Sequence, residues 1–350
     1  MGEERKIQYN QLVGFSSALF RRAGLRKQDA DVVAESYIDN NLRGIDSHGI
    51  RLVPNCIRRL KEGGVNPNPK IEVEADNPST ARLNGDNALG QIVAIKGMNL
   101  AIEKADRNGI GFVICANANN AGAMSSYSRM ALDKGMAGLA MATTVPSMFA
   151  WGGIKRVISN PPISIAFPGR KTRFILDICL GSVAWNKIYV KRDKGLPLLP
   201  GWAVDNRGEK TDDPAKAADG GSVIPIGGHK GYGLTLAVEL FTAILGGHLF
   251  GFDMKGLFDD PHEGEGISMS LAALNVSQLL DSEVLFERAE AFFSMIKDSP
   301  LKAGGGEIMI PGEPEEKVSR IRRKEGIPIP GEVEAALKRC SADLGVEYPF

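Results

Sequence analysis

The stretch Gly44-Ile-Asp-Ser-His-Gly-Ile-Arg51 is a polar, glycine-flanked turn between two helical patterns. The preceding pattern covers residues 29–43 and stops at the first glycine of the stretch. The following pattern covers residues 51–61 and stops at Gly63-Gly64. Because glycine adopts the left-handed conformation that commonly ends a helix, these stops predict two helices joined by an exposed turn.

The pattern changes from helical to mixed at about residue 70. An amphipathic helix is predicted at 12–20, and Asn66-Pro-Asn-Pro69 is typical of a linker. Strand-like runs follow at 71–73, 112–116, 138–142, 163–167 and 174–178, and helical patterns at 90–107, 124–134, 183–193, 232–245, 282–297, 314–323 and 332–344. A long segment rich in Gly, Pro and Asp, at 195–228, is expected to bind a ligand or to carry short elements of its own. This mixture predicts an α/β fold.

Composition excludes several classes of protein. The chain has 350 residues with 42 basic and 42 acidic side chains, so nothing indicates binding to nucleic acid or to an anionic membrane. No apolar run approaches membrane-spanning length, and the charged N-terminus does not resemble a secretory signal. The cysteines are widely spaced, which predicts free thiols and a cytoplasmic location, and the histidines show no metal-binding spacing. The cysteines are Cys56, Cys115, Cys179 and Cys340.

His48 is the leading candidate for acid–base chemistry. Its unperturbed pKa of ~6.5 lets imidazole exchange a proton near neutral pH. A hydroxyl precedes it at Ser47, and a cation follows at Arg51. The alternative is a capping serine beside a satisfied surface histidine, and the residues alone leave both interpretations open.

Glycine-rich and polar loops offer further candidate sites. The chain has no GxGxxG motif after a strand, but Pro225-Ile-Gly-Gly-His-Lys-Gly-Tyr-Gly233 opens an apolar helix. Free backbone N–H groups and the charge of Lys230 favour a pyrophosphate or carboxylate site over a simple tight turn. The segment from Trp151 to Ile163 either contacts a nicotinamide or ribose, or merely caps a strand. Asp177, within a strand-like run, is a candidate to orient His48.

The motifs taken together resemble the type-2 malate/L-lactate dehydrogenase family over nearly the whole chain. The matching segments are Gly44-Ile-Asp-Ser-His-Gly49, Ala121-Gly-Ala123 with Tyr127, Trp151-Gly-Gly153, Asn160-Pro161 with Ala166-Phe-Pro168, Leu176-Asp177, Val183-Ala-Trp185, Gly201-Trp-Ala-Val-Asp205, Thr211-Asp-Asp-Pro214, Gly227-Gly-His-Lys-Gly-Tyr-Gly233 and Pro311-Gly-Glu-Pro314. Each motif alone is weak, but so many in one order make a chance match very improbable.

The resemblance implies hydride transfer between NAD or NADP and a small 2-hydroxy or 2-oxo acid. It implies an NAD(P)-binding domain with a mixed sheet that is not a Rossmann fold, at 71–279. It also implies a helical domain made from residues 1–70 and about 280–350, and a homodimer.

The resemblance also assigns roles to residues. His48 would be the proton donor and acceptor, with Ser47 and Asp177 orienting it. Substrate-binding residues would be Arg51, Thr144 and Asn120. Cofactor-binding residues would be Asn119, Asn120, Ala121, Gly122, Ala123, Ser159, Asn160, Pro161, Lys230, Gly231, Gly312 and Glu313. No metal is expected.

Three departures from the family pattern point to an altered substrate pocket. Many relatives have His where this chain has Asn120, which argues against ureidoglycolate as the substrate. Many have an aromatic residue in place of Cys56, and often an Arg in place of Leu52. Two alternatives therefore stay open: reduction of a cyclic imine carboxylate or another unusual substrate, and a cofactor-binding protein without turnover.

Overall fold

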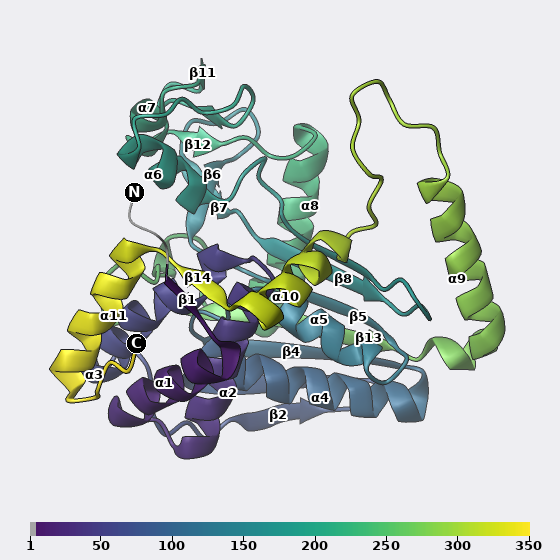
Figure 1. Cartoon of the computed structure of the whole chain (residues 1–350), viewed down its shortest axis with the longest axis horizontal. Helices are drawn as coiled ribbons and strands as arrows, with labels where there is room; N and C mark the ends of the chain where they lie inside the picture. The colour runs from purple at the N-terminus through teal and green to yellow at the C-terminus, as the bar shows by residue number, and fades with distance from the viewer. Residues whose placement is uncertain (1–4) are drawn as a thin grey trace.

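A seven-stranded mixed sheet forms the centre of the computed structural model, which describes residues 5–350 (Figure 1). The order is β2-β3-β4-β13-β5-β8-β9. The strands are β2 (Glu72–Asp76), β3 (Thr80–Ala88), β4 (Ile110–Ala118), β5 (Ala137–Ala142), β8 (Pro162–Phe167), β9 (Phe174–Cys179) and β13 (Ile267–Leu274). Only β3 and β4 are parallel, joined by helix α4 (Gly90–Asn108), and the other neighbouring pairs are antiparallel. The predicted α/β class is confirmed.

Two strands of this seven-stranded sheet, β3 and β13, were missing from the sequence-based prediction. β13 occupies the middle of the sheet, between β4 and β5, and its residues are buried almost throughout. Its sequence, ISMSLAAL, lacks the alternation of a half-exposed strand, because both of its faces are covered. In β3, by contrast, polar residues alternate with buried ones, and the Asn, Gly and Asp among them are typical of turns.

Helices cover both faces of this sheet. Helix α4 and helix α5 (Ser125–Leu132) pack together on one face. Helix α8 (His229–Glu239) continues into a π-helical turn, η3 (Leu240–Ile244), which contacts β4 and β13. The predicted helix at 232–245 therefore exists, but it begins earlier and is not regular at its end.

Both chain ends contribute to a second apolar core. Strand β1 (Arg5–Ile7) pairs with β14 (Ile327–Ile329), and helix α11 (Gly331–Leu344) packs on α1 (Tyr9–Arg22) and α3 (Val53–Glu62). Helix α2 (Lys27–Leu42) contacts α1, α4, α5 and α10 (Glu313–Glu325), which joins this helical layer to the sheet (Figure 1). The charged residues 1–4 lie outside the described part of the chain.

Helix α9 (Ser282–Lys297) lies at the periphery of the chain in Figure 1. Backbone N–H groups of Lys171 and Thr172 donate to Glu290 on this helix. The helix thus meets the turn between β8 and β9 rather than the core shared by the two chain ends. No helix among residues 5–350 is both long and apolar enough to span a bilayer.

The long segment at 195–228 carries short elements of its own. Strands β10 (Ala203–Val204), β11 (Lys210–Thr211) and β12 (Ser222–Val223) form a small antiparallel sheet beside helix α7 (Pro214–Ala218). They share an apolar cluster with β6 (Pro146–Phe149), β7 (Arg156–Ser159) and α6 (Trp185–Asp193). This subassembly forms one side of the site described next.

Candidate active site

A cavity of about 1500 Å³ opens where the helical layer, the sheet and the small subassembly meet. Its walls are the turn at 43–48, the segments 120–125 and 142–147, helix α6 and the loop 252–259. Common ligand pockets measure roughly 300–1,000 Å³. This cavity therefore has room for a dinucleotide together with a small acid.

Side chains from distant elements fix the turn that carries His48. The turn consists of two short 3-10 segments, η1 (Asp46–His48) and η2 (Ile50–Leu52). Asn41 Oδ1 accepts the N–H of Ile50 at 2.7 Å, and Asn41 Nδ2 donates to Asp46 at 2.6 Å. Arg322 of α10 binds both oxygens of Asp46, at 2.7 and 2.9 Å. A bidentate pair of this kind restricts geometry as well as adding energy, so it holds the turn in one shape.

His48 itself is half-buried, and one of its ring nitrogens is occupied. Ser47 Oγ lies 2.9 Å from His48 Nδ1, which leaves Nε2 as the nitrogen available to a ligand. Burial and the nearby Arg51 guanidinium lower the pKa of His48 below its ordinary value. Arg51 is exposed, lines the same cavity and has no ion-pair partner among residues 5–350, whereas Arg43 and Arg129 are paired with Asp39. An anion in the cavity would therefore meet an uncompensated positive charge beside the imidazole.

Asp177 lies on β9 and lines the cavity, but its hydrogen bond is to helix α5. Its Oδ2 accepts the backbone N–H of Ser125, the first residue of α5, at 2.8 Å. Burial raises the pKa of this carboxyl. Among the described residues no hydrogen bond joins Asp177 to His48, and the side chain that hydrogen-bonds to the imidazole is Ser47.

The predicted segment 119–123 lies across the cavity wall. Asn120, Ala121, Gly122 and Ala123 line the cavity, and Gly122 has a φ of 70°. Asn120 Oδ1 accepts from Tyr37 Oη at 3.2 Å and from the N–H of Gly122 at 3.1 Å. Asn119 is fully buried behind the wall, where its amide binds the end of β3. The four residues 120–123 thus contact the cavity, and Asn119 supports them.

The other predicted residues divide into those in the lining and those outside it. Thr144, Asn160 and Gly312 are in the lining; Ser159, Pro161, Lys230, Gly231 and Glu313 are not. The Asn160 amide accepts from Gly181 N at 2.6 Å and donates to Val183 O at 3.0 Å, so it braces a loop of the wall. Lys230 is exposed near the start of α8, and Glu313 is paired with Lys297.

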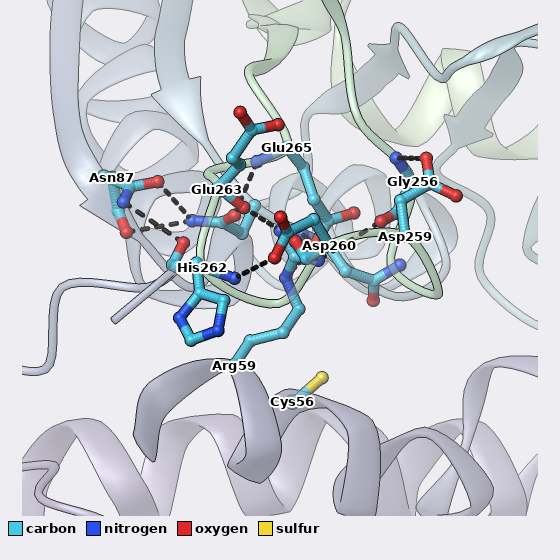
Figure 2. Close-up of polar contacts among 12 residues, drawn as sticks. Cys56, Arg59, Asn87, Gly256, Asp259, Asp260, His262, Glu263 and Glu265 are labelled. Carbon is cyan, nitrogen blue, oxygen red and sulfur yellow. Dashed lines mark hydrogen bonds and ion pairs between the residues drawn. The ribbon is translucent and has the colours of Figure 1, made fainter. Parts of the chain in front are cut away.

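Sequence reasoning missed two buried charged residues, Arg59 and Glu265, behind the segment 119–123. Figure 2 shows Arg59 of α3 reaching the loop that carries Asp260, Glu263 and Glu265. Burial raises the pKa of the Glu265 carboxyl, which lines the cavity, to about 7. The one signal in the sequence was indirect: Cys56, which departs from the family pattern, lies on the same helix as Arg59.

No group of three or more His, Cys, Asp and Glu side chains within residues 5–350 is placed to hold a metal. A Cβ on Gly122 would lie 3.1 Å from Asn40 Nδ2, so glycine keeps the backbone close to its neighbours and open to the cavity. Cys56 and Cys115 are buried, which raises the pKa of each thiol to about 12 and makes them unreactive.

Comparison with known proteins identifies the family. The family model described as malate/L-lactate dehydrogenase matches residues 7–338. An L-sulfolactate dehydrogenase of Methanocaldococcus jannaschii is 38% identical over 94% of both chains, and a malate dehydrogenase of Pyrococcus abyssi is 33% identical over 98% of this chain and 96% of that one. The solved sulfolactate dehydrogenase of M. jannaschii superposes with a TM-score of 0.92 at 36% identity, covering 98% of both chains. Malate dehydrogenase of Pyrococcus horikoshii OT3 gives 0.91 at 30% identity, covering 99% of this chain and 97% of that one. This chain therefore belongs to the malate/L-lactate dehydrogenase family.

Proposed function

We propose that this protein is an NAD(P)-dependent oxidoreductase that interconverts a small 2-hydroxy acid and its 2-oxo acid. The observation that carries the proposal is the His48 site. One ring nitrogen of this histidine is bound by Ser47, and among residues 5–350 the other has no hydrogen-bond partner and the neighbouring Arg51 has no ion-pair partner. The relatives named as malate and sulfolactate dehydrogenases act on acids of this class, which supports the same assignment.

The residues of the turn supply the proton and the orientation. Reduction of a ketone places negative charge on its oxygen, and protonated His48 donates a proton there from Nε2; oxidation reverses the transfer. Ser47 on Nδ1 keeps the ring in position. Arg51 binds the substrate carboxylate, and once its charge is compensated it no longer lowers the pKa of His48, so substrate binding favours the protonated form. The bound nicotinamide supplies or accepts the hydride.

Asp177 acts through the wall of the cavity. Its carboxylate anchors the start of α5, and with it the end of the segment 120–125. In the proposed function Ser47 orients the imidazole, and Asp177 holds the neighbouring wall of the cavity in place.

The cofactor, NAD or NADP, would bind against the predicted residues that line the cavity. These are Asn120, Ala121, Gly122, Ala123, Asn160 and Gly312. Asn119, Ser159, Pro161, Lys230, Gly231 and Glu313 would support this surface or extend it. The binding domain at 71–279 is not a Rossmann fold in this proposal, because its sheet has a single parallel pair instead of a parallel doubly wound array.

We further propose a cytoplasmic homodimer. The described cysteines are all free thiols, which suits a reducing compartment. Large apolar side chains are exposed on α8 and η3 and again on α9, and exposed apolar surface of this kind is a candidate for association between subunits. They include Leu234, Leu240, Phe241, Ile244, Phe292 and Met295. The two domains of each subunit would be 71–279, and 1–70 with about 280–350, where both chain ends share one apolar core.

Oxidation of NADH and of NADPH against a panel of acids tests the function. The panel contains pyruvate, oxaloacetate, sulfopyruvate and piperideine-2-carboxylate, with His48→Asn as the control enzyme. Turnover of a 2-oxo acid that is lost in the variant supports the proposal. Turnover of the cyclic imine alone would move the assignment to an imine reductase, and cofactor binding without any turnover would favour a binding protein.

A further inference from the structure

Arg59 is a fully buried cation around which one wall of the cavity is built. Its side chain is 1% exposed, and its guanidinium donates to the carbonyls of Gly256 and Asp260, each at 3.2 Å, and to that of Glu263 (Figure 2). Its Nε lies 3.8 Å from the Glu265 carboxylate. A buried charge is costly unless it is paired and hydrogen-bonded. Arg59 therefore ties together three backbone carbonyls of the loop at 254–265, which is also held by contacts within the loop such as that of Gly256 N–H with Asp259.

Glu265 connects that loop to the segment 119–123. Its Oε1 accepts the backbone N–H of Asn120 at 3.0 Å, and its own N–H donates to Asn119 Oδ1 at 2.9 Å. Residues 254–259 and Glu265 line the cavity, as Asn120 does. Arg59 and Glu265 thus join helix α3, which directly follows the His48 turn, to two other walls of the same cavity.

The orientation of the Asn120 amide follows from its partners. The N–H of Gly122 is a donor only, so the atom facing it is Oδ1, which also accepts from Tyr37 Oη. Tyr37 in turn contacts Cys56 Sγ at 3.0 Å. Nδ2 has no partner among the described residues, and the residue is partly exposed in the cavity lining. The Nδ2 group of Asn120 is therefore left to donate a hydrogen bond to a ligand.

We propose that Glu265, held by Arg59, is a positioning residue that fixes Asn120 so that its Nδ2 donates to an acceptor oxygen of the bound ligand. The acceptor is a carboxylate or carboxamide oxygen of the substrate or cofactor, so this role rests on the proposed function. Glu265 acts through Asn120 and does not touch the reacting atoms.

The affinity for the ligand should depend on pH through the charge of Glu265. Burial raises the pKa of this carboxyl to about 7, and it is faced by Arg59 and Cys56 of α3, by Tyr37 of α2 and by Asp259 of its own loop. An ionised carboxylate accepts a hydrogen bond about twice as strongly as a neutral group. The ligand should therefore bind more tightly as the pH rises through 7.

Glu265→Gln tests the proposal, with Glu263→Gln as the matched control. Glu263 lies two residues away, but its carboxylate is half-exposed and pairs with Lys255 at 3.0 Å. At about pH 8 we expect Glu265→Gln to raise roughly tenfold the KM of the ligand that Asn120 binds, either the acid or the cofactor. A tenfold change corresponds to about 1.4 kcal/mol of binding free energy. The kcat of the variant should stay within about threefold of the wild-type value. The fall in KM expected as the pH rises through 7 should vanish in Glu265→Gln and persist in Glu263→Gln. An unchanged KM and pH profile would overturn the proposal.

Amide hydrogen exchange provides a readout that needs no turnover. The Asn120 N–H is protected by Glu265, so a peptide covering 119–123 should exchange faster in Glu265→Gln, while peptides from β4 and β13 stay unchanged. Arg59→Met should reproduce the effect, and Arg59→Lys, which keeps the charge, should partly rescue it. Faster exchange throughout the chain, or no change at 119–123, would overturn the positioning role. An enzyme inactive on every acid would refute the proposed function, and the exchange result would still decide this one.

Discussion

Replacing Glu265 by glutamine should remove a pH-dependent loss of folding stability. The side chain is buried, and its pKa rises from an ordinary 4.5 to about 7 in the folded protein. The unfolded chain ionises this group near 4.5, so between the two values the folded state binds more protons than the unfolded state. The contribution of Glu265 to the free energy of unfolding is therefore fully present below pH 4.5 and is lost as the pH rises through 7.

The expected loss is about 3 kcal/mol. Each pKa unit corresponds to about 1.4 kcal/mol, and the pKa moves from 4.5 to about 7. Urea unfolding followed by tryptophan fluorescence, at pH values from about 4.5 to 8.5, measures it in the wild type and in Glu265→Gln. The free energy of unfolding of the wild type minus that of the variant should fall by about 3 kcal/mol over this range.

A control separates this effect from other titrations. Groups such as His48 are present in all the proteins and cancel in the difference. Glu263→Gln removes a half-exposed carboxylate from the same loop and should leave the pH dependence of the wild type unchanged. Parallel stability curves for the wild type and Glu265→Gln would refute the reasoning, because they would mean that the carboxyl ionises in the folded protein as it does in water.

Three further outcomes follow from the site. His48→Asn should lower kcat by roughly 10²–10⁴-fold and leave the cofactor Kd unchanged; near-normal turnover would remove the proton-donor role. Arg51→Ala should raise the KM of the acid by roughly 10–100-fold, the scale of a lost charge-assisted hydrogen bond, and that of the cofactor far less; equal effects on both would place the carboxylate elsewhere. Arg322→Ala should lower the free energy of unfolding, measured in urea, by about 1–2 kcal/mol, since its bidentate partner Asp46 is half-exposed. It should also lower kcat, measured by steady-state kinetics, because the His48 turn loosens. An unchanged kcat would show that the turn keeps its shape without Arg322.

Local patterns were sufficient for much of this fold. Helix periodicity and glycine stops located α2 and α3 on either side of the His48 turn, because helix ends depend on residues within one turn of the chain. The same approach failed for β13, whose burial on both faces removes the alternating pattern that would reveal a strand. It indicated that the segment at 195–228 could carry short elements of its own, but not that these would be two-residue strands paired into a small sheet.

The sequence by itself determined the α/β class and the turn that presents His48, since periodicity and glycine stops depend on neighbours along the chain, whereas the pairing of Ser47 with the ring was left open until the structure showed it. Only the tertiary structure decided what surrounds them. Asn120 and Glu265 are 145 positions apart, yet one hydrogen bond joins them in the cavity wall. The need to satisfy a buried cation, Arg59, drives that arrangement, and burial becomes visible only once the chain has folded.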